Sequence, residues 1–127
     1  MAKHNEVGKI GEDVACDFLG QKGFKVMERN FRKPYGEIDI IATDPKGLLR
    51  FVEVKTVSWE TGGGEPRYRP EENVHPAKAR RMMNVISAYL VSHETEGEWQ
   101  FDVLAVFLDQ NTKTAKVRFL ENVVLGS

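Results

Sequence analysis

The chain has 127 residues, with 18 Lys and Arg against 19 Asp and Glu, and a formal net charge of −1. This length predicts one domain over residues 1–127, large enough to bury a core without disulfide staples. The near-neutral charge argues against a protein held on nucleic acid by bulk charge, so such binding depends on local clusters. The longest purely apolar run, residues 103–108, is far shorter than the roughly 20 residues that span a bilayer, so we expect no membrane role.

The cysteine and histidine content limits both compartment and chemistry. One cysteine, Cys16, allows no internal disulfide, and no apolar signal segment follows Met1. We therefore expect a cytoplasmic location. The three histidines are scattered without zinc-ligand spacing, so a zinc site is not expected.

The first predicted element is an amphipathic helix over residues 5–22, ended by Gly23. Its apolar residues follow the three-four spacing of one helical face: Val7, Ile10, Gly11, Val14, Ala15, Phe18 and Leu19. Glu12 lies on the flank of this stripe, roughly 120° from its centre at about 100° per residue. We expect Glu12 to face whatever the helix packs against.

A strand over residues 24–30 precedes a hairpin over residues 37–56 whose two strands carry unexpected charge. Both strands are rich in Ile, Val and Phe, yet acids and a lysine stand where aliphatic residues are usual. The connection Asp44-Pro45-Lys46-Gly47 fits a type I turn that ends in a left-handed glycine. Counting back from this turn predicts three opposed pairs: Ile41 with Phe51, Asp39 with Glu53, and Glu37 with Lys55.

The second half of the chain begins with a stretch that shows no periodicity, residues 58–74, which we expect to be a flexible or functional loop. A second helix is predicted up to residue 92. It starts at Pro76 with His75 as its cap, or earlier with Asn73 as the cap. Strands over residues 99–108 and 115–120 and a short tail complete the chain.

The order helix, strand, strand, strand, helix, strand, strand predicts a three-layer α/β domain with a mixed five-stranded sheet. The second helix is a crossover, so the third and fourth strands should be parallel and adjacent. The fourth strand is apolar on both faces, as expected when helices cover both sides.

The hairpin charges form a candidate site. Two carboxylates on one sheet face repel each other unless a proton, a lysine or a cation lies between them, and Mg²⁺ prefers such oxygen ligands. Asp39, Glu53 and the carbonyl of Val54 would be the ligands, and Lys55 could orient a water or stabilise charge on a phosphate. The alternative is a cross-strand ion pair on an exposed sheet edge, which stabilises little.

The chain resembles two nested groups of proteins. An acid on the second strand followed by Glu-x-Lys on the third resembles the restriction-endonuclease-like nucleases, the PD-(D/E)XK superfamily. The ordered blocks resemble more closely the YraN family of small uncharacterised bacterial proteins. These blocks are His4-Asn5-Glu6-Val7-Gly8-Lys9-Ile10-Gly11-Glu12, Arg29-Asn30, Gly36-Glu37-Ile38-Asp39-Ile40-Ile41-Ala42, Phe51-Val52-Glu53-Val54-Lys55-Thr56, Lys78, Tyr89-Leu90 and Phe101-Asp102-Val103.

This resemblance implies a restriction-endonuclease-like fold and roles for four residues. Asp39 and Glu53 would be metal ligands, Lys55 the catalytic lysine, and Glu12 a helix acid completing the site, as in the archaeal Holliday-junction resolvases. The chain departs from the common pattern where Ile38 replaces a proline before the acid. Asp102 is expected to have a structural role, since it lies toward the other end of its strand.

Aromatic and basic residues interleave in the loop and in the first turns of the second helix. Such residues stack on bases and contact phosphates of single-stranded or distorted nucleic acid. The candidates are Trp59, Arg67, Tyr68, Arg69, Lys78, Arg80 and Arg81. The alternative is a loop and a solvated helix face whose nearby glutamates dilute the charge.

The sequence therefore predicts a Mg²⁺- or Mn²⁺-dependent endonuclease, a phosphodiesterase acting on DNA, with branched or single-stranded forms among its substrates. No small-molecule cofactor is expected. A homodimer would suit cleavage of both strands of a branched substrate, but no interface is indicated. The alternative is a non-catalytic module that binds nucleic acid or protein and retains the nuclease fold.

Overall fold

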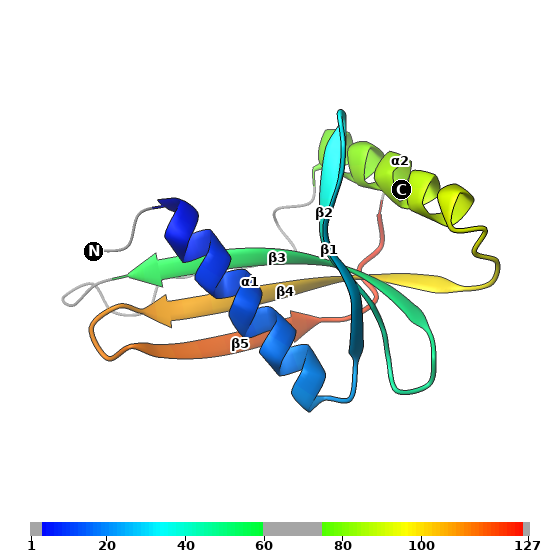
Figure 1. Cartoon of the computed structure of the whole chain (residues 1–127). Helices are drawn as coiled ribbons and strands as arrows, with labels where there is room; N and C mark the ends of the chain where they lie inside the picture. The colour runs from blue at the N-terminus through cyan, green and yellow to red at the C-terminus, as the bar shows by residue number, and fades with distance from the viewer. Residues whose placement is uncertain (1–3, 60–74, 126–127) are drawn as a thin grey trace.

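The computed structural model describes residues 4–59 and 75–125. Its elements follow the predicted order, as Figure 1 shows: α1 (His4–Gln21), β1 (Lys25–Lys33), β2 (Gly36–Thr43), β3 (Leu49–Trp59), α2 (Pro76–Ser92), β4 (Trp99–Asp109) and β5 (Thr114–Leu120). No helix in the described part of the chain is long and apolar enough to cross a membrane.

The strands form one mixed sheet in the order β1-β2-β3-β4-β5. β3 and β4 are parallel, and every other neighbouring pair is antiparallel. A parallel pair requires a long crossover, and α2 supplies it. The predicted mixed sheet and the adjacency of β3 and β4 are confirmed.

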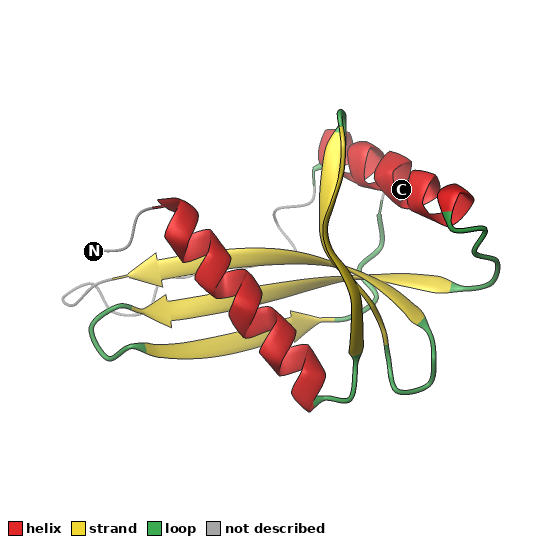
Figure 2. Cartoon of the chain, viewed as in Figure 1, coloured by secondary structure: helices red, strands yellow, loops and turns green. Residues whose placement is uncertain are grey.

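The two helices lie against opposite faces of the sheet (Figure 2). The α1 face is closed by a cluster that includes Ala15 and Leu19 of the helix with Ile40, Val52, Leu104 and Val106 of the sheet. The α2 face is closed by Val85, Ile86 and Tyr89 with Ile41, Phe51 and Phe101. β4 contributes to both clusters and is buried from residue 101 to residue 108. As predicted, β4 is apolar on both faces because a helix covers each side of the sheet.

Two predicted boundaries change for physical reasons. β3 continues to Trp59, because Ser58 and Trp59 still pair with Leu108 and Asp109 of β4. The loop predicted from residue 58 therefore began too early, and residues 60–74 lie outside the described part. β1 continues to Lys33, because its last residues still pair with the start of β2.

The structure decides between the two predicted N-cap residues of α2. The helix begins at Pro76, and His75 takes the N-cap position with an extended backbone and no side-chain capping bond. Asn73, the other predicted cap, lies outside the described residues. Pro76 suits this first-turn position because the amide hydrogen that it lacks would have no partner inside the helix.

The β1–β2 hairpin bends sharply at Asn30, whose φ of 55° lies in the left-handed region. Side chains normally alternate along a strand, so Arg29 and Phe31 should share a face. Instead Arg29 contacts α1, and Phe31 packs in the cluster under α2. The outer part of the hairpin thus turns toward α2, where Gly36 lies so close to Val85 that a β-carbon would overlap it. This bend draws β2 away from β3.

Candidate metal and phosphate site

The β2–β3 ladder has the predicted register, with Ile41 opposite Phe51 and Ile40 opposite Val52. The backbone pairing between β2 and β3 ends at Ile40 and Val52. Asp39 and Glu53 are the next residues on the two strands, just where β2 begins to leave β3. The turn chemistry at Asp44 therefore led to the correct register, and Asp44 accepts the turn bond from the Gly47 amide as expected.

The Asp39 side chain occupies the position where the next backbone hydrogen bond between β2 and β3 would form. Its Oδ2 accepts a hydrogen bond from the Val54 amide at 2.7 Å. The N–H and C=O of one strand residue point to the same side of the strand, so the Val54 carbonyl faces the same gap. The gap is therefore lined by backbone and carboxyl oxygens.

The carboxyl groups of Asp39 and Glu53 lie within hydrogen-bonding reach of each other. Burial of Asp39 raises its pKa, and the hydrogen bond and negative charge of Glu53 raise it further, to about 9. The Val54 amide opposes this shift, but not enough to reverse it. At neutral pH the pair therefore holds a proton in the position where two carboxylates would otherwise repel.

Two lysines lie beside the pair. Lys78, in the first turn of α2, places Nζ 3.0 Å from Oε2 of Glu53. Lys55 is two residues along β3 from Glu53, on the same face, and its side chain is exposed. Within the described residues Lys55 has no ion-pair partner. One lysine thus balances the single negative charge that the protonated pair retains, and the other extends into solvent beside it.

The third predicted pair, Glu37 with Lys55, is not part of the ladder. Glu37 instead accepts hydrogen bonds from Arg32, its partner across the β1–β2 hairpin, with the Nη2 contact at 3.1 Å. The prediction assumed a flat hairpin, whereas the bend at Asn30 moves the outer part of β2 away from β3.

Glu12 lies on the α1 side of the bend. Its Oε1 accepts hydrogen bonds from Nε of Arg29 and Nδ2 of Asn30, both at 2.9 Å. Arg29 also binds Asp13 at 2.8 Å, which lowers the pKa of that exposed carboxyl. Across residues 4–59 and 75–125, no three acidic, histidine or cysteine side chains gather into a metal-binding group. The structure therefore brings Asp39 and Glu53 together, whereas Glu12 is bound by residues of β1.

The predicted nucleic-acid contacts divide into three groups. Lys78 lies at the carboxyl pair, and Trp59 forms the last residue of β3, where its carbonyl binds the Gln110 amide. Arg80 and Arg81 are exposed on α2. Arg67, Tyr68 and Arg69 lie outside the described residues.

Asp102 belongs to a separate cluster near the start of β3. It is fully buried and binds Nη1 of Arg50 at 2.8 Å. Its other oxygen accepts hydrogen bonds from the Gln100 side chain and the Asn122 amide, each at 2.9 Å. All these partners fix the chain around β4, so the contacts agree with the predicted structural role.

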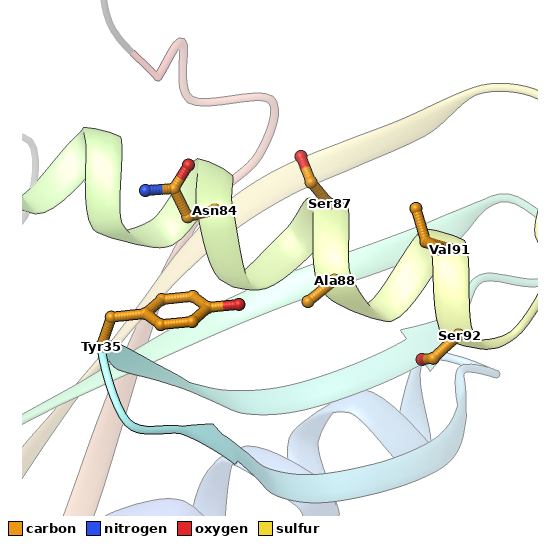
Figure 3. Close-up of a pocket in the computed structure, with 6 residues that line it drawn as sticks. All are labelled: Tyr35, Asn84, Ser87, Ala88, Val91 and Ser92. Carbon is orange, nitrogen blue, oxygen red and sulfur yellow. The ribbon is translucent and has the colours of Figure 1, made fainter.

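The groove beside the hairpin tip offers different chemistry. It has a volume of about 570 Å³ and lies between Tyr35 and one side of α2, as Figure 3 shows. Its other lining residues are Asn84, Ser87, Ala88, Val91 and Ser92. No carboxylate, imidazole or cationic side chain is among these lining residues.

Two functions of named residues were missed in the sequence. The sequence marks Arg29 and Asn30 only as one of the blocks shared with the family, whereas the structure makes them the residues that hold Glu12. Lys78 is predicted to contact nucleic acid, whereas in the structure it forms an ion pair with Glu53. Helical spacing can indicate which face Lys78 shares, but not which strand residue that face meets.

The sequence matches the family described as uncharacterised protein family UPF0102 over residues 11–106. A UPF0102 protein of Flavobacterium psychrophilum is 36% identical over 122 residues, covering 96% of each chain. One from Campylobacter concisus is 38% identical over 118 residues, covering 93% of each chain. One from Helicobacter pylori strain P12 is 38% identical over 121 residues, covering 95% of this chain and 93% of the relative. These matches confirm the predicted YraN family.

Proposed function

The chain belongs to the UPF0102 family, and we propose that it is a metal-dependent nuclease that hydrolyses phosphodiester bonds in DNA. One observation carries this proposal: the carboxyl groups of Asp39 and Glu53 meet where β2 leaves β3, and Lys55 follows on the same face. The proposal includes a restriction-endonuclease-like fold, related to that of the archaeal Holliday-junction resolvases. The element order and the acid followed by Glu-x-Lys support it.

The oxygen atoms at the gap fit a hard divalent cation. Asp39, Glu53 and the Val54 carbonyl would hold Mg²⁺ or Mn²⁺, since such ions prefer carboxylate and carbonyl oxygens. In the metal-free protein the pair holds a proton, and a bound ion would take the place of that proton. A bound cation supplies a Lewis acid that polarises a phosphate oxygen and favours ionisation of water.

Lys55 supplies positive charge on the solvent side of the pair. Its ammonium group can reach a phosphate that lies over Glu53, because both side chains leave the same face of β3. Hydrolysis places additional negative charge on the phosphate oxygens, and a fixed cation stabilises that charge more than it stabilises the ground state. Lys55 also donates hydrogen bonds that can orient the attacking water.

Lys78 and Glu12 position groups around this centre. Lys78 holds the Glu53 carboxylate in place through its 3.0 Å ion pair. Arg29 and Asn30 both bind Oε1 of Glu12, so Oε2 is the oxygen directed to other partners, such as a water at the edge of the site. Glu12 is therefore held at the bend of the β1–β2 hairpin, beside the strand next to the one that carries Asp39.

A second candidate function is a nucleic-acid-binding module that does not cut. Lys78 favours it, because this side chain already supplies a positive charge to Glu53 without a metal ion. In that case the acids would be a charge-balanced structural group, and only the cationic surface around them would act.

Cleavage assays separate the two functions. Labelled single-stranded, duplex and branched DNA are incubated with Mg²⁺ or Mn²⁺ and with wild type, Asp39→Asn or Lys55→Ala protein. Each substitution should slow cleavage by about 100-fold or more. Asp17→Asn and Lys46→Ala, exposed residues of the same types, serve as matched controls that keep wild-type rates.

Two results would count against the nuclease. Cleavage that survives in both variants would assign the activity to something other than this pair. Failure of the wild type to cut any substrate, with binding retained, would favour the module that does not cut.

A further inference from the structure

The sheet register places an arginine of β5 in line with Lys55. Lys55 lies opposite Ala105 of β4, and Ala105 lies opposite Arg118 of β5. Residues opposed in this way project from the same face of a sheet. Lys55 and Arg118 are therefore separated by two strand spacings, about 10 Å, on the face that α2 covers further along.

The side-chain burial of β5 confirms which face Arg118 uses. Val117 and Phe119 pack in the cluster under α1, and Leu120 packs in the cluster under α2. Alternation then directs Lys116 and Arg118 to the α2 face, where both are exposed. Arg118 has no hydrogen-bond or ion-pair partner within the described residues.

Three acids near this part of the sheet have partners other than Lys55 and Arg118. Glu53 is bound to Lys78, and the Asp109 carboxylate accepts the Asn111 amide in the β4–β5 turn. Glu121 lies beyond the end of β5 and binds Arg50. Lys55 and Arg118 therefore have no acidic partner among residues 4–59 and 75–125, and with the exposed Lys116 they place three cations on this face of β3 and β5.

We propose that Arg118 and Lys116 form, with Lys55, a phosphate-binding row that guides a DNA strand across the sheet from the carboxyl pair toward β5. The inference rests on the proposed function for its starting point, the phosphate at Lys55. Arg118 suits a phosphate because its guanidinium offers two parallel N–H donors. Lys116, two residues away at about 3.4 Å per residue, contacts the following part of the backbone.

Another role for these cations is protection of an edge strand. Among the described residues β5 pairs with β4 alone and ends the sheet, and charged side chains keep such edges from joining other molecules. This role would make Lys116 and Arg118 important for solubility and irrelevant to DNA affinity. A binding measurement on monomeric protein separates the two roles.

The test measures binding of a short fluorescent single-stranded DNA by anisotropy, in EDTA, over a range of salt concentrations. The double variant Lys116→Glu, Arg118→Glu should raise Kd by about tenfold at low salt, and the loss of two phosphate contacts should reduce the salt slope by about 1.4. The matched control, Lys25→Glu with Lys46→Glu, makes the same charge change at exposed sites near the opposite end of the sheet. Its Kd should stay within about twofold of wild type.

Three outcomes decide the inference. The row is supported if the β5 variant alone loses affinity and if the single variant Arg118→Lys, which keeps Lys116 and the positive charge, retains it. Equal losses in the two double variants would show a general charge effect and overturn it. Wild-type affinity with increased aggregation, detected by light scattering, would assign the cations to edge protection and also overturn it.

The binding assay contains no metal, so it does not depend on cleavage. If wild-type protein cuts no DNA but the β5 variant binds poorly, the row stands and the nuclease proposal fails. If Asp39→Asn abolishes cleavage and the β5 variant binds normally, the nuclease proposal stands and the row fails.

Discussion

Two charged clusters on β3 differ in how their carboxyl groups are held. Near the start of the strand, Arg50 binds three carboxylates, those of Asp44, Asp102 and Glu121. Backbone amides and the Gln100 side chain supply further donors to Asp44 and Asp102. In the middle of the strand, the Asp39 and Glu53 carboxyls instead lie against each other, with one lysine beside them. Two acids in contact are stable only with a proton or a cation, so the second cluster is the one that indicates chemistry.

Arg50→Met should cause the largest loss of stability, because it leaves the fully buried Asp102 without its charged partner. Removing one member of a buried ion pair typically costs about 3–5 kcal/mol. Urea unfolding measures the change, with Lys46→Ala as an exposed control expected within about 0.5 kcal/mol of wild type. A loss below about 1 kcal/mol would mean that Asp102 finds other compensation.

Asp39→Asn should act in the opposite direction on the metal-free protein. The amide keeps an acceptor for the Val54 amide and removes the cost of a second acid beside Glu53. Functional sites often give up stability in this way, so the variant should gain about 0.5–2 kcal/mol in urea unfolding. A loss of similar size would instead give Asp39 a structural role.

The two clusters should also respond oppositely to pH. Burial opposes ionisation of Asp44, but the Leu48 and Lys46 amides and Arg50 outweigh it and lower its pKa. Stability from Asp44 is therefore present above the unfolded pKa of about 3.9 and lost as pH falls below it. The pKa of Asp39 is raised to about 9, so the folded state holds a proton that the unfolded state releases, and stability falls as pH rises toward 9.

Unfolding of single variants across pH measures both effects. The advantage of Asp39→Asn over wild type should grow by about 1 kcal/mol or more between about pH 5 and pH 9. The disadvantage of Asp44→Asn should shrink only below about pH 4. Parallel stability curves for wild type and Asp39→Asn would show that the carboxyl pair is not protonated as described.

Lys78→Gln should have the smallest effect on stability. The two side chains of the Lys78–Glu53 pair are 36% and 17% exposed, and such pairs contribute less than about 1 kcal/mol. The same change removes a cation that competes with metal, so thermal stabilisation by Mn²⁺ should increase relative to wild type. Arg81→Gln, an exposed change on the same helix, should alter neither quantity.

The sequence predicts most of the fold, because its signals are local. Apolar spacing predicts both helices, and the turn chemistry at Asp44 and Gly47 predicts the register that brings Asp39 toward Glu53. The unpredicted features depend on contacts between distant elements. The left-handed backbone at Asn30 bends the hairpin, and neither the Lys78 contact with Glu53 nor the alignment of Arg118 with Lys55 can be predicted before the packing of α2 and the register of β4 and β5 are known.

Calorimetric titration of Mn²⁺ into wild-type and Asp39→Asn protein tests the central claim most directly. The account predicts that the wild type binds the ion, and that removing one charged ligand weakens binding by about 10-fold or more while the fold is retained. Asp102→Asn, which changes the Arg50 cluster near the start of β3, should leave the affinity of the folded protein unchanged. Equal Mn²⁺ affinity in wild-type and Asp39→Asn protein, or no binding by the wild type, would contradict the account.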